Sequence, residues 1–309
     1  MLPNVMKVIR AGNPNYNMFL FTWVLTNWCN YSCTYCCEKG MMVDKWAKQD
    51  SISNYKLTLS KLKRFDKPFH VELYGGEPTL HPNLLEILHT LKSIDNCKIV
   101  QIITNLSRPL AYFEQMNVPE LHDLGIMASF HAEHYDEDFI TKAKAINAME
   151  HLHFRVTVNL SDDPAHWPLI LDLIKQLDEN NIEYGLHFLY DTASWKSNYT
   201  EEFYKLFQPL QKNLFQGKQV QIHSYEFDDG TTQQLTDLEV FENKYHYFKG
   251  YTCTPRFYEI AFDGTIRNTC TRKEFNTLTI TADKIERTES CPRDCCSCEM
   301  MFNAYKELT

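Results

Sequence analysis

The chain has 309 residues, of which 44% are hydrophobic and 23% are charged, and its formal net charge is −9. These proportions are typical of a soluble globular protein and exclude a disordered or fibrous chain. The length allows two domains or one large barrel, and the negative charge disfavours nucleic acids and anionic membrane surfaces as partners.

The N-terminal segment contains no apolar run long enough for a signal peptide. The longest strongly apolar run, Phe19–Leu25, has the length of a strand and is too short to cross a bilayer. We therefore expect a cytoplasmic protein. Of its 11 cysteines, four lie between positions 29 and 37 and four between 291 and 298. In a reducing compartment such clusters indicate metal or cluster ligands rather than disulfides.

Up to about residue 190, short β-rich runs alternate with helical patterns. The predicted strands are Phe19–Thr26, Phe69–Tyr74, Lys98–Thr104, Leu124–Phe130, Phe154–Leu160 and Glu183–Tyr190. The predicted helices lie near 51–65, 82–93, 109–117, 136–150 and 164–181, with Asp136 and Asp163 as N-caps and with Pro82 and Pro164 in first turns.

Strands separated by single helices predict right-handed βαβ crossovers and a parallel sheet. Six such units favour a barrel over an open sheet, although periodicity alone does not decide between them. The predicted fold is α/β, a partial (β/α)6 barrel of the TIM type over residues 1–190.

Beyond residue 191 the pattern changes. Tyr199–Phe215 and Gln233–Phe248 are predicted helices, with a strand near Gln219–Tyr225, so residues 191–249 form a connecting helical segment. Strands over Arg256–Phe262 and Thr265–Thr271 flank Asp263-Gly264, a two-residue hairpin signal. Residues 250–309 are predicted to form a small cysteine-rich α+β module, which needs bound ligands because one hairpin cannot stabilise a fold.

The first cysteine cluster directly follows the first predicted strand. Its core is Cys29-x3-Cys33-x2-Cys36, with Tyr35 before the last cysteine. Active sites of parallel barrels are built at the carboxyl ends of the strands. Three thiolates from one loop can hold three irons of a cubane and leave the fourth iron open. A zinc site or buried apolar cysteines are the alternatives, and we expect the adjacent Cys37 to be a packed thiol.

A second motif, Gly75-Gly76-Glu77-Pro78, follows the second predicted strand. The glycines allow a close approach to a ligand, and the Glu77 carboxylate can accept a hydrogen bond from an ammonium group. A tight turn is the structural alternative.

With these two motifs the sequence resembles the radical S-adenosylmethionine (SAM) superfamily over roughly residues 19–190. The resemblance implies that Cys29, Cys33 and Cys36 bind a [4Fe–4S] cluster and that SAM chelates the open iron. It also implies that Gly75, Gly76 and Glu77 bind the SAM amino group and that Tyr35 lies near the adenine. Reductive cleavage then gives a 5′-deoxyadenosyl radical, with a flavodoxin or ferredoxin-type protein as the electron donor.

Polar residues near the ends of later strands are further candidates for contacts with the SAM ribose and carboxylate, although caps and strand-end polar residues are as common. These candidates are Thr104, Asn105, Ser129, Arg155 and Asn159. The segment Ser129–His134 is also rich in polar groups that could contact a substrate or move a proton.

The C-terminal region supplies six more thiols. They are Cys253, Cys270, Cys291, Cys295, Cys296 and Cys298. The pattern resembles the shortened SPASM, or twitch, extension of radical SAM enzymes, which implies one auxiliary [4Fe–4S] cluster. Spacing does not decide between a Cys295-x2-Cys298 ending and a Cys291-x4-Cys296-x-Cys298 ending, and a structural zinc ribbon is the alternative.

The resemblance favours an oxidoreductase or epimerase that takes hydrogen from a small molecule, such as a sugar or aminocyclitol. The alternative is a maturase that modifies a ribosomally made peptide. Only 18 residues precede the first predicted strand, which leaves little room for a peptide-recognition domain. A metal-binding protein without catalysis is disfavoured because Cys29, Cys33, Cys36 and Glu77 are all present.

Overall fold

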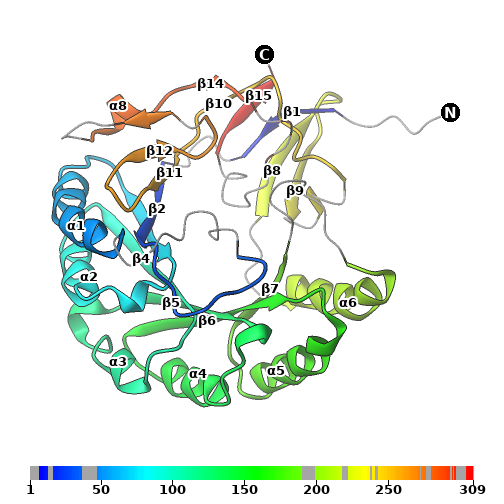
Figure 1. The fold of residues 1–309 in the computed structure, drawn as a ribbon. Coiled ribbons are helices and arrows are strands. Elements are labelled where there is room, and N and C mark those ends of the chain that lie inside the picture. Colours follow the sequence, from blue (N-terminus) through cyan, green and yellow to red (C-terminus); the bar gives the residue numbers. More distant parts are fainter. Residues whose placement is uncertain are drawn as a thin grey trace.

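The computed structural model contains two β-sheets and a set of helices that cover one of them (Figure 1). It describes residues 7–12, 17–36, 47–189, 199–217, 222–236, 239–240, 243–271, 273–275, 280–292, 294, 296 and 304–308.

The larger sheet has nine strands in the order β13-β12-β11-β2-β3-β4-β5-β6-β7. Six consecutive parallel strands form its main part: β2 (Phe19–Thr26), β3 (Phe69–Gly75), β4 (Cys97–Thr104), β5 (Leu124–Phe130), β6 (Leu152–Leu160) and β7 (Tyr184–Phe188). All six lie where the sequence predicted strands. The partial parallel barrel is therefore confirmed.

Helices follow the outer side of this curved sheet (Figure 1). They are α1 (Ala47–Lys63), α2 (Leu84–Lys92), α3 (Leu110–Glu114), α4 (Phe139–Asn147), α5 (Trp167–Glu179) and α6 (Glu201–Gly217). Short 3-10 turns precede or follow several of them: η1 (Pro78–Leu80), η2 (Pro119–Leu121), η3 (Ala132–His134) and η4 (Pro164–His166).

The sequence pattern explains which face of each element is buried. In α2 the buried residues Leu84, Ile87, Leu88 and Leu91 recur at helical spacing and form one apolar stripe. In β5 buried and half-buried residues alternate. The helix-facing side of β5 is therefore fully buried and its inner side is less covered, whereas all eight residues of β2 are buried.

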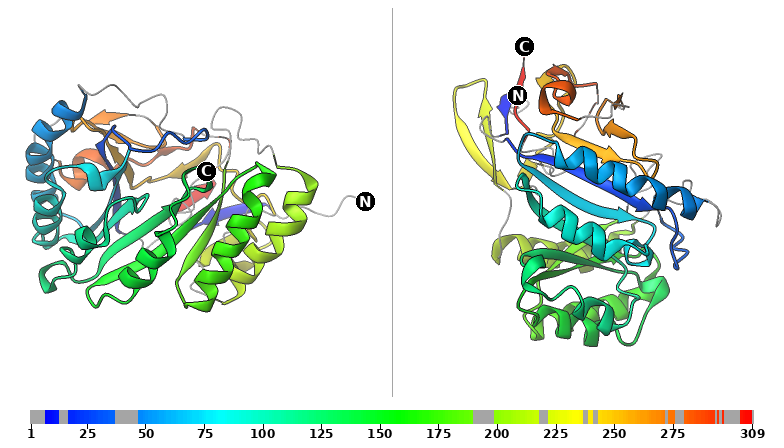
Figure 2. Two further views of the ribbon diagram at one scale, coloured as in Figure 1. Left: turned by 60° about the horizontal axis from the view of Figure 1, so that its bottom comes forward. Right: turned by 90° about the vertical axis from the view of Figure 1, so that its left-hand side faces the viewer.

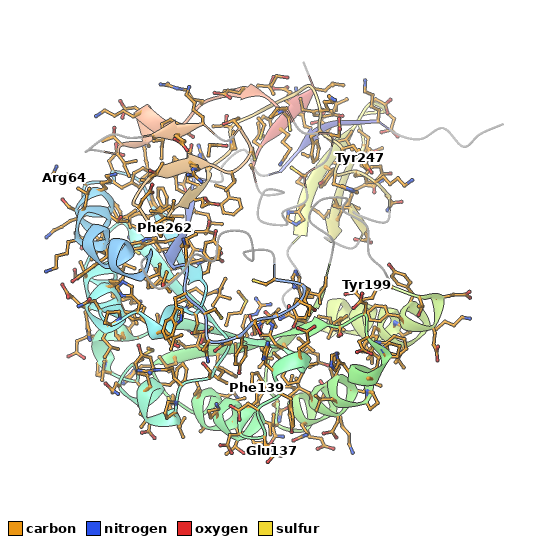
Figure 3. The ribbon with its side chains drawn as sticks, in the orientation of Figure 1. Arg64, Glu137, Phe139, Tyr199, Tyr247 and Phe262 are labelled. Carbon is orange, nitrogen blue, oxygen red and sulfur yellow. The ribbon has the colours of Figure 1, made fainter. Side chains whose placement is uncertain are left out.

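Aromatic contacts hold helices and strand ends in place. Phe139, the first residue of α4, packs edge-on against Phe130 of β5 with ring centroids 5.2 Å apart (Figure 3). The Tyr199 hydroxyl, just before α6, donates to the Leu160 carbonyl at 2.6 Å and accepts from the Leu189 amide at 2.6 Å, so it joins the ends of β6 and β7.

A hairpin from the C-terminal region extends the barrel sheet. Strand β11 (Phe257–Ile260) pairs in parallel with β2, and β12 (Ile266–Asn268) and β13 (Glu274–Phe275) continue the sheet in antiparallel fashion. The predicted hairpin is present, but its loop is longer than the predicted two residues. The Ala261 amide donates to the Thr265 carbonyl, so Phe262–Gly264 form a three-residue turn. Gly264 has φ +81°, as this turn requires.

The second sheet has the order β14-β10-β15-β1-β8-β9 and combines both ends of the chain (Figures 1 and 2). Its strands are β1 (Val8–Ala11), β8 (Ile222–Phe227), β9 (Thr232–Thr236), β10 (Tyr251–Cys253), β14 (Glu289–Ser290) and β15 (Lys306–Leu308). Helix α8 (Ala282–Ile285) lies between β13 and β14 in the chain. Three of its strands, β10, β14 and β15, come from the predicted C-terminal module over residues 250–309, whereas β1 comes from the N-terminal end and β8 and β9 come from the predicted connecting segment.

The predicted helix over Gln233–Phe248 is wrong at its start and at its end, because residues 233–236 are a strand and residues 243–248 are turn or coil, whereas Glu239 and Val240 are helical. Residues Thr232–Thr236 form β9, which pairs with β8 from Ile222↔Thr236 to Glu226↔Thr232. Asp228, Asp229 and Gly230 make the connecting turn, with Gly230 at φ +83°. This Asp-Asp-Gly turn signal outweighs the helical spacing of the apolar residues that follow it.

Of the two N-caps predicted in the barrel, Asp163 accepts the Ala165 amide at 2.9 Å, so that prediction is confirmed. The Asp136 prediction is wrong, because α4 begins at Phe139 and its N-cap position is Asp138. Within the described part of the chain, no helix is long and apolar enough to cross a membrane.

Candidate active site

The cysteine loop begins where β2 ends. The Tyr31 amide donates to Cys29 Sγ at 3.4 Å, and the Cys36 amide donates to the Cys33 carbonyl at 3.3 Å. Burial and the neighbouring thiols of Cys29 and Cys36 raise the pKa of Cys33 to about 12. The three thiols therefore lie close enough to influence one another's charge, and cluster binding must displace their protons.

The Gly75-Gly76-Glu77 motif packs directly on this loop. The Gly76 amide donates to the Thr26 carbonyl at 2.7 Å, and the Glu77 amide donates to the Trp28 carbonyl at 2.8 Å. A Cβ atom on Gly75 would lie 2.3 Å from Thr26 O, and one on Gly76 would lie 2.1 Å from Trp28 O. The glycines thus allow the two chain segments to touch, a role that the sequence analysis did not identify.

Glu77 is almost fully buried and joins the end of β3 to the end of β4. Its Oε1 accepts hydrogen bonds from the Thr79 amide at 3.0 Å, from Thr79 Oγ1 at 2.6 Å and from Thr104 Oγ1 at 2.7 Å. Its Oε2 accepts the Asn105 amide at 2.7 Å. Because a carboxylate has about four acceptor positions spread over two oxygens, Oε2 can accept a further hydrogen bond. Burial raises the pKa of Glu77, and these hydrogen bonds oppose the rise.

Asn105 connects Glu77 to the cysteine loop. Its Oδ1 accepts the Ser107 amide at 3.0 Å, which fixes the orientation of the side-chain amide. Nδ2 then donates to Asn30 Oδ1 at 2.9 Å and lies 3.9 Å from Cys29 Sγ. Of the two sequence-predicted residues here, Asn105 is thereby brought beside the first cysteine, and Thr104 contacts Glu77.

The turn after Asn105 is strained. Leu106 has φ +59°, a conformation that a leucine seldom adopts, and its side chain is fully buried. Lys142 of α4 donates from Nζ to the Leu106 carbonyl at 2.7 Å and to Asp136 Oδ2 at 2.6 Å. A buried lysine therefore holds the turn from the helix side.

The polar segment after β5 holds the opposite side of the cysteine loop. Glu133 accepts the Thr34 amide at 2.8 Å and also the Thr34 hydroxyl. His134 Nε2 accepts the Ser32 amide at 3.2 Å, and its ring stacks on Tyr31 with centroids 4.5 Å apart. The loop between the cysteines is therefore clamped by a strand end that lies about 100 residues further along the chain.

His131 contacts two residues of the loop. Its Nδ1 lies 2.9 Å from the Tyr35 hydroxyl and 3.5 Å from Cys33 Sγ, and its ring stacks on Tyr35. Burial lowers the pKa of His131 to about 4, so the ring is neutral at neutral pH. The Tyr35 hydroxyl can donate to Nδ1 or accept from it, depending on which nitrogen of the His131 ring carries the proton.

The remaining sequence-predicted SAM residues lie on β5 and β6. Ser129 is the register partner of Thr157, and Arg155 is the partner of Met127. Asn159 donates from Nδ2 to the Phe130 carbonyl at 3.0 Å, and its Oδ1 lies 2.9 Å from His187 Nδ1. The Asn159 amide is thus used within the protein, between β5 and β7.

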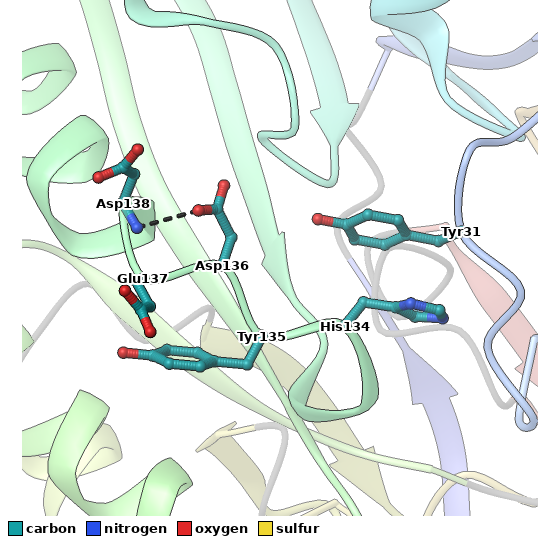
Figure 4. Close-up of a pocket in the computed structure, with 6 residues that line it drawn as sticks. All are labelled: Tyr31, His134, Tyr135, Asp136, Glu137 and Asp138. Atoms are coloured by element: carbon teal, nitrogen blue, oxygen red, sulfur yellow. Dashed lines mark hydrogen bonds between the residues drawn. The ribbon is translucent and has the colours of Figure 1, made fainter.

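A pocket of about 560 Å³ opens beside the cysteine loop (Figure 4). Its lining residues are Tyr31, His134, Tyr135, Asp136, Glu137 and Asp138. The Tyr31 and His134 rings lie on one side and the three carboxylates on the other (Figure 4). The Asp138 amide donates to Asp136 Oδ1 at 2.9 Å, which orders the acidic side.

The C-terminal cysteines form a second group. Cys253 and Cys296 are buried in the second hydrophobic core, and Cys270 and Cys291 pack against that core. Burial raises the pKa of Cys296 to about 12, and Cys270, Cys291 and Cys253 raise it further. Four thiols therefore converge. Cys295 and Cys298, like Cys37, lie outside the described residues.

A parallel barrel with three cysteines in the loop after its first strand defines an enzyme with an iron–sulfur cluster at that loop. Residues 23–183, more than half of the chain, match the family model of the radical SAM superfamily. The chain belongs to this superfamily, so a [4Fe–4S] cluster and SAM are its implied cofactors. The donor set at Cys29, Cys33 and Cys36 fits that cluster.

Curated relatives match only part of this chain. The GTP 3′,8-cyclase of Actinobacillus pleuropneumoniae serotype 3 is 29% identical over 107 residues, which are 32% of this chain and 30% of that protein. The GTP 3′,8-cyclase of Trichodesmium erythraeum is 35% identical over 80 residues, 25% of this chain and 24% of that protein. The chain thus matches less than a third of the length of these relatives.

Among solved structures, native anSMEcpe with bound AdoMet matches with a TM-score of 0.50 and 16% identity. The match covers 81% of this chain and 74% of that chain. At this identity it shows the common fold alone.

Proposed function

We propose that this protein is a radical SAM dehydrogenase that oxidises an alcohol of an uncharged or cationic polyol, such as a sugar or aminocyclitol. The observation that carries the proposal is the group of four converging thiols in the C-terminal module. A second cluster at those thiols would be a one-electron acceptor, which an alcohol oxidation requires.

The proposed ligands of the auxiliary [4Fe–4S] cluster are Cys253, Cys270, Cys291 and Cys296. Backbone hydrogen bonds fix three of them: the Cys270 amide donates to Asn268 Oδ1 at 2.9 Å, the Cys291 amide to the Tyr251 carbonyl at 2.7 Å and the Cys296 amide to the His246 carbonyl at 2.8 Å.

The chemistry divides between the cofactors and this chain's own residues. When bound, the first cluster and SAM supply a 5′-deoxyadenosyl radical that removes a hydrogen atom from the substrate carbon. An alcohol that then loses one electron and one proton becomes a carbonyl. A flavodoxin or ferredoxin-type protein would deliver the electron that starts the reaction.

The residues around the cysteine loop have proposed roles in binding and orientation. Glu77 Oε2 would accept from the SAM amino group while Oε1 holds Thr79 and Thr104. Tyr35 would face the adenine, with its hydroxyl fixed by His131. Ser129 and Arg155, on the inner side of the sheet, would contact the ribose and carboxylate.

The pocket beside the loop supports an uncharged or cationic substrate. Its described lining residues include Asp136, Glu137 and Asp138 and no lysine or arginine. Asp136 is paired with Lys142 at 2.6 Å, so Glu137 and Asp138 supply the negative charge of the lining. Carboxylates repel phosphate groups and attract ammonium groups. A nucleoside triphosphate, the substrate in the name of the curated relatives, does not suit this lining.

The first test counts iron. Protein reconstituted anaerobically should hold about eight irons, and a variant with Cys29, Cys33 and Cys36 replaced by alanine should keep about four. Cys97→Ala is the matched control, because Cys97 lies on β4, away from both cysteine groups. Zinc in place of iron in the triple variant would overturn the auxiliary cluster.

The second test uses defined probes in deuterated water. An aminocyclitol, glucosamine, glucose and GTP are incubated separately with SAM and dithionite. We expect 5′-deoxyadenosine together with a product two mass units lighter from one of the first three. Deuterium at the product carbon would instead indicate epimerisation with a cysteine hydrogen donor such as Cys295. Synthetic peptides are incubated in the same way, and turnover of peptides alone would indicate a maturase.

A further inference from the structure

Lys306 of β15 is completely buried in the second sheet. Lysine is one of the residue types that are almost never fully buried unless an opposite charge compensates them. A buried ammonium group is costly in an apolar core because it loses its hydration. The position of Lys306 therefore places a cation inside the core of the second sheet.

The register of the sheet puts Lys306 directly beside a proposed cluster ligand. In the antiparallel pair of β10 and β15, Lys306 is the partner of Cys253. Partners in antiparallel strands point to the same face, with Cβ atoms roughly 4.5–5.5 Å apart. On its other side, Lys306 is the partner of Ala11 in β1. The lysine thus lies on the face of the sheet that carries the buried thiol.

Two of the contacts of Lys306 bear on the position of its ammonium group. Nζ donates to the Ala304 carbonyl at 2.8 Å and lies 5.0 Å from the centre of the Phe248 ring. Phe248 and Ala304 belong to the same buried cluster as Cys253 and Cys296. The ammonium is held inside the core that the four thiols share.

The charge acts on those thiols. Burial raises the pKa of Cys253 to about 11, and the positive charge of Lys306 opposes that rise. Lys306 has the same opposing effect on Cys296. Its field therefore favours negative charge at two of the four sulfurs.

We propose that Lys306 raises the reduction potential of the auxiliary cluster and so makes that cluster a better acceptor of the substrate's electron. The proposal rests on the proposed function, since it requires a cluster at Cys253, Cys270, Cys291 and Cys296. In the reaction the substrate C–H gives its hydrogen atom to the adenosyl radical, the O–H gives its proton to water, and the remaining electron passes to the auxiliary cluster. A buried positive charge stabilises the reduced cluster, which carries one more negative charge than the oxidised cluster.

The experiment isolates the auxiliary cluster in the triple variant lacking Cys29, Cys33 and Cys36. Its potential is measured by redox titration followed by electron paramagnetic resonance, without SAM or substrate. Lys306→Met removes the charge and the hydrogen bond. Lys306→Gln removes the charge but keeps an N–H donor for Ala304, and Lys306→Arg keeps the charge.

We expect Lys306→Met and Lys306→Gln to lower the equilibrium constant for one-electron reduction at least tenfold, a shift of about 59 mV to more negative potential. Lys306→Arg should stay near the parent value. Lys249→Met is the matched control, because Lys249 is exposed and paired with Asp294 at 2.7 Å, and it should leave the potential unchanged.

The outcomes separate the two proposals. If the triple variant holds no iron–sulfur cluster, the proposed function fails. If the cluster forms and Lys306→Gln has the parent potential, the role of Lys306 is wrong while the auxiliary cluster stands. Loss of iron from both neutral variants would make Lys306 an assembly residue and would also overturn the proposal.

Discussion

At the scale of single residues, Gly76 shows how little space separates the two motifs of the site. An added Cβ would lie 2.1 Å from Trp28 O and 2.8 Å from Cys29 N. Both are backbone atoms, so they cannot move aside as the end of a flexible side chain could. Any side chain at this position must therefore push the cysteine loop away from β3.

We expect Gly76→Ala to lose the first cluster while the protein stays folded. Iron content should fall from about eight to about four per chain, with SAM cleavage abolished. Gly125→Ala is the control, because its added Cβ would meet only the Gln101 side chain, at 3.2 Å or more. Full iron content in Gly76→Ala would contradict the prediction, since the contact between residue 76 and the Trp28–Cys29 backbone would then have relaxed.

The sequence predicted the glycine motif but not the reason for it. Gly75 and Gly76 were expected to admit a ligand, whereas their closest neighbours are Thr26 and Trp28. That contact depends on the pairing of β2 with β3 and on the register shift between Val24 and Thr26. Local sequence contains no signal for a contact between segments about 50 residues apart.

Glu72 gives a prediction about pH. It lies on β3 between its register partners Thr22 and Gln101, and burial raises its pKa from 4.5 to about 7, with Arg155 opposing the rise. The folded state then binds more protons than the unfolded state between pH 4.5 and 7, so this group lowers stability as pH rises through that range. The loss amounts to roughly 3 kcal/mol above pH 7.

Glu72→Gln should therefore gain stability relative to the parent protein as pH rises from 4.5 to 8, as measured by urea unfolding of the two proteins side by side. The measured quantity is the difference in unfolding free energy between the two proteins, because His70 also contributes to the pH dependence. Its Nε2 lies 3.9 Å from Glu72 Oε1, and burial lowers the pKa of His70 to about 4. A difference that does not change with pH would contradict the prediction.

At the scale of elements, the ends of β3 and β4 and helix α4 act together through the turn at Leu106. Glu77 holds this turn from β3, and Lys142 holds it from α4. The strands and helices themselves were predictable from alternating burial and helical spacing. The contact between Lys142 and the Leu106 turn was not predictable. Nothing in the sequence distinguishes Lys142 from other helical lysines, and the carbonyl that it contacts lies 36 residues earlier in the chain.

We expect Lys142→Met to lower the free energy of unfolding by about 2–3 kcal/mol, since it leaves the Leu106 carbonyl without its buried donor. The freed turn also carries Asn105, so SAM affinity of the folded, reconstituted protein should fall. Lys144→Met, on the exposed side of the same helix, should change stability by less than about 0.5 kcal/mol. Equal urea midpoints for the two variants would argue against a stabilising contact between Lys142 and the Leu106 turn.

At the scale of the whole molecule, the second sheet was the part that sequence predicted least well. Strands β1 and β15 have only four and three residues, and each lies far along the chain from its partners. Such short strands carry no reliable periodicity. The barrel was predictable because each of its strands pairs with the next one in the sequence.

Strand β1 should be required for the auxiliary site. It pairs with both β8 and β15, Val8 and Ala11 belong to the second core, and the Val8 carbonyl accepts a hydrogen bond from the Tyr251 hydroxyl. Deleting residues 1–12 should therefore reduce iron from about eight to about four per chain while SAM cleavage persists. Deleting residues 1–6 is the control. Eight irons in the longer deletion would show that the sheet tolerates the loss of β1.

The pairing of β1 with β15 also orders events during synthesis. The barrel strands can pair as they leave the ribosome, because each partner is made soon after the last. Strand β1 emerges before them and has to wait for Glu226 and Glu307, the partners of Arg10, which are made some two hundred and three hundred residues later. Insertion of the proposed auxiliary cluster at the second sheet would therefore have to follow synthesis of β15, whereas the cysteine loop after β2 lies in a part of the protein that is made early. The two proposed cluster sites would thus be separated in time of maturation as well as in space.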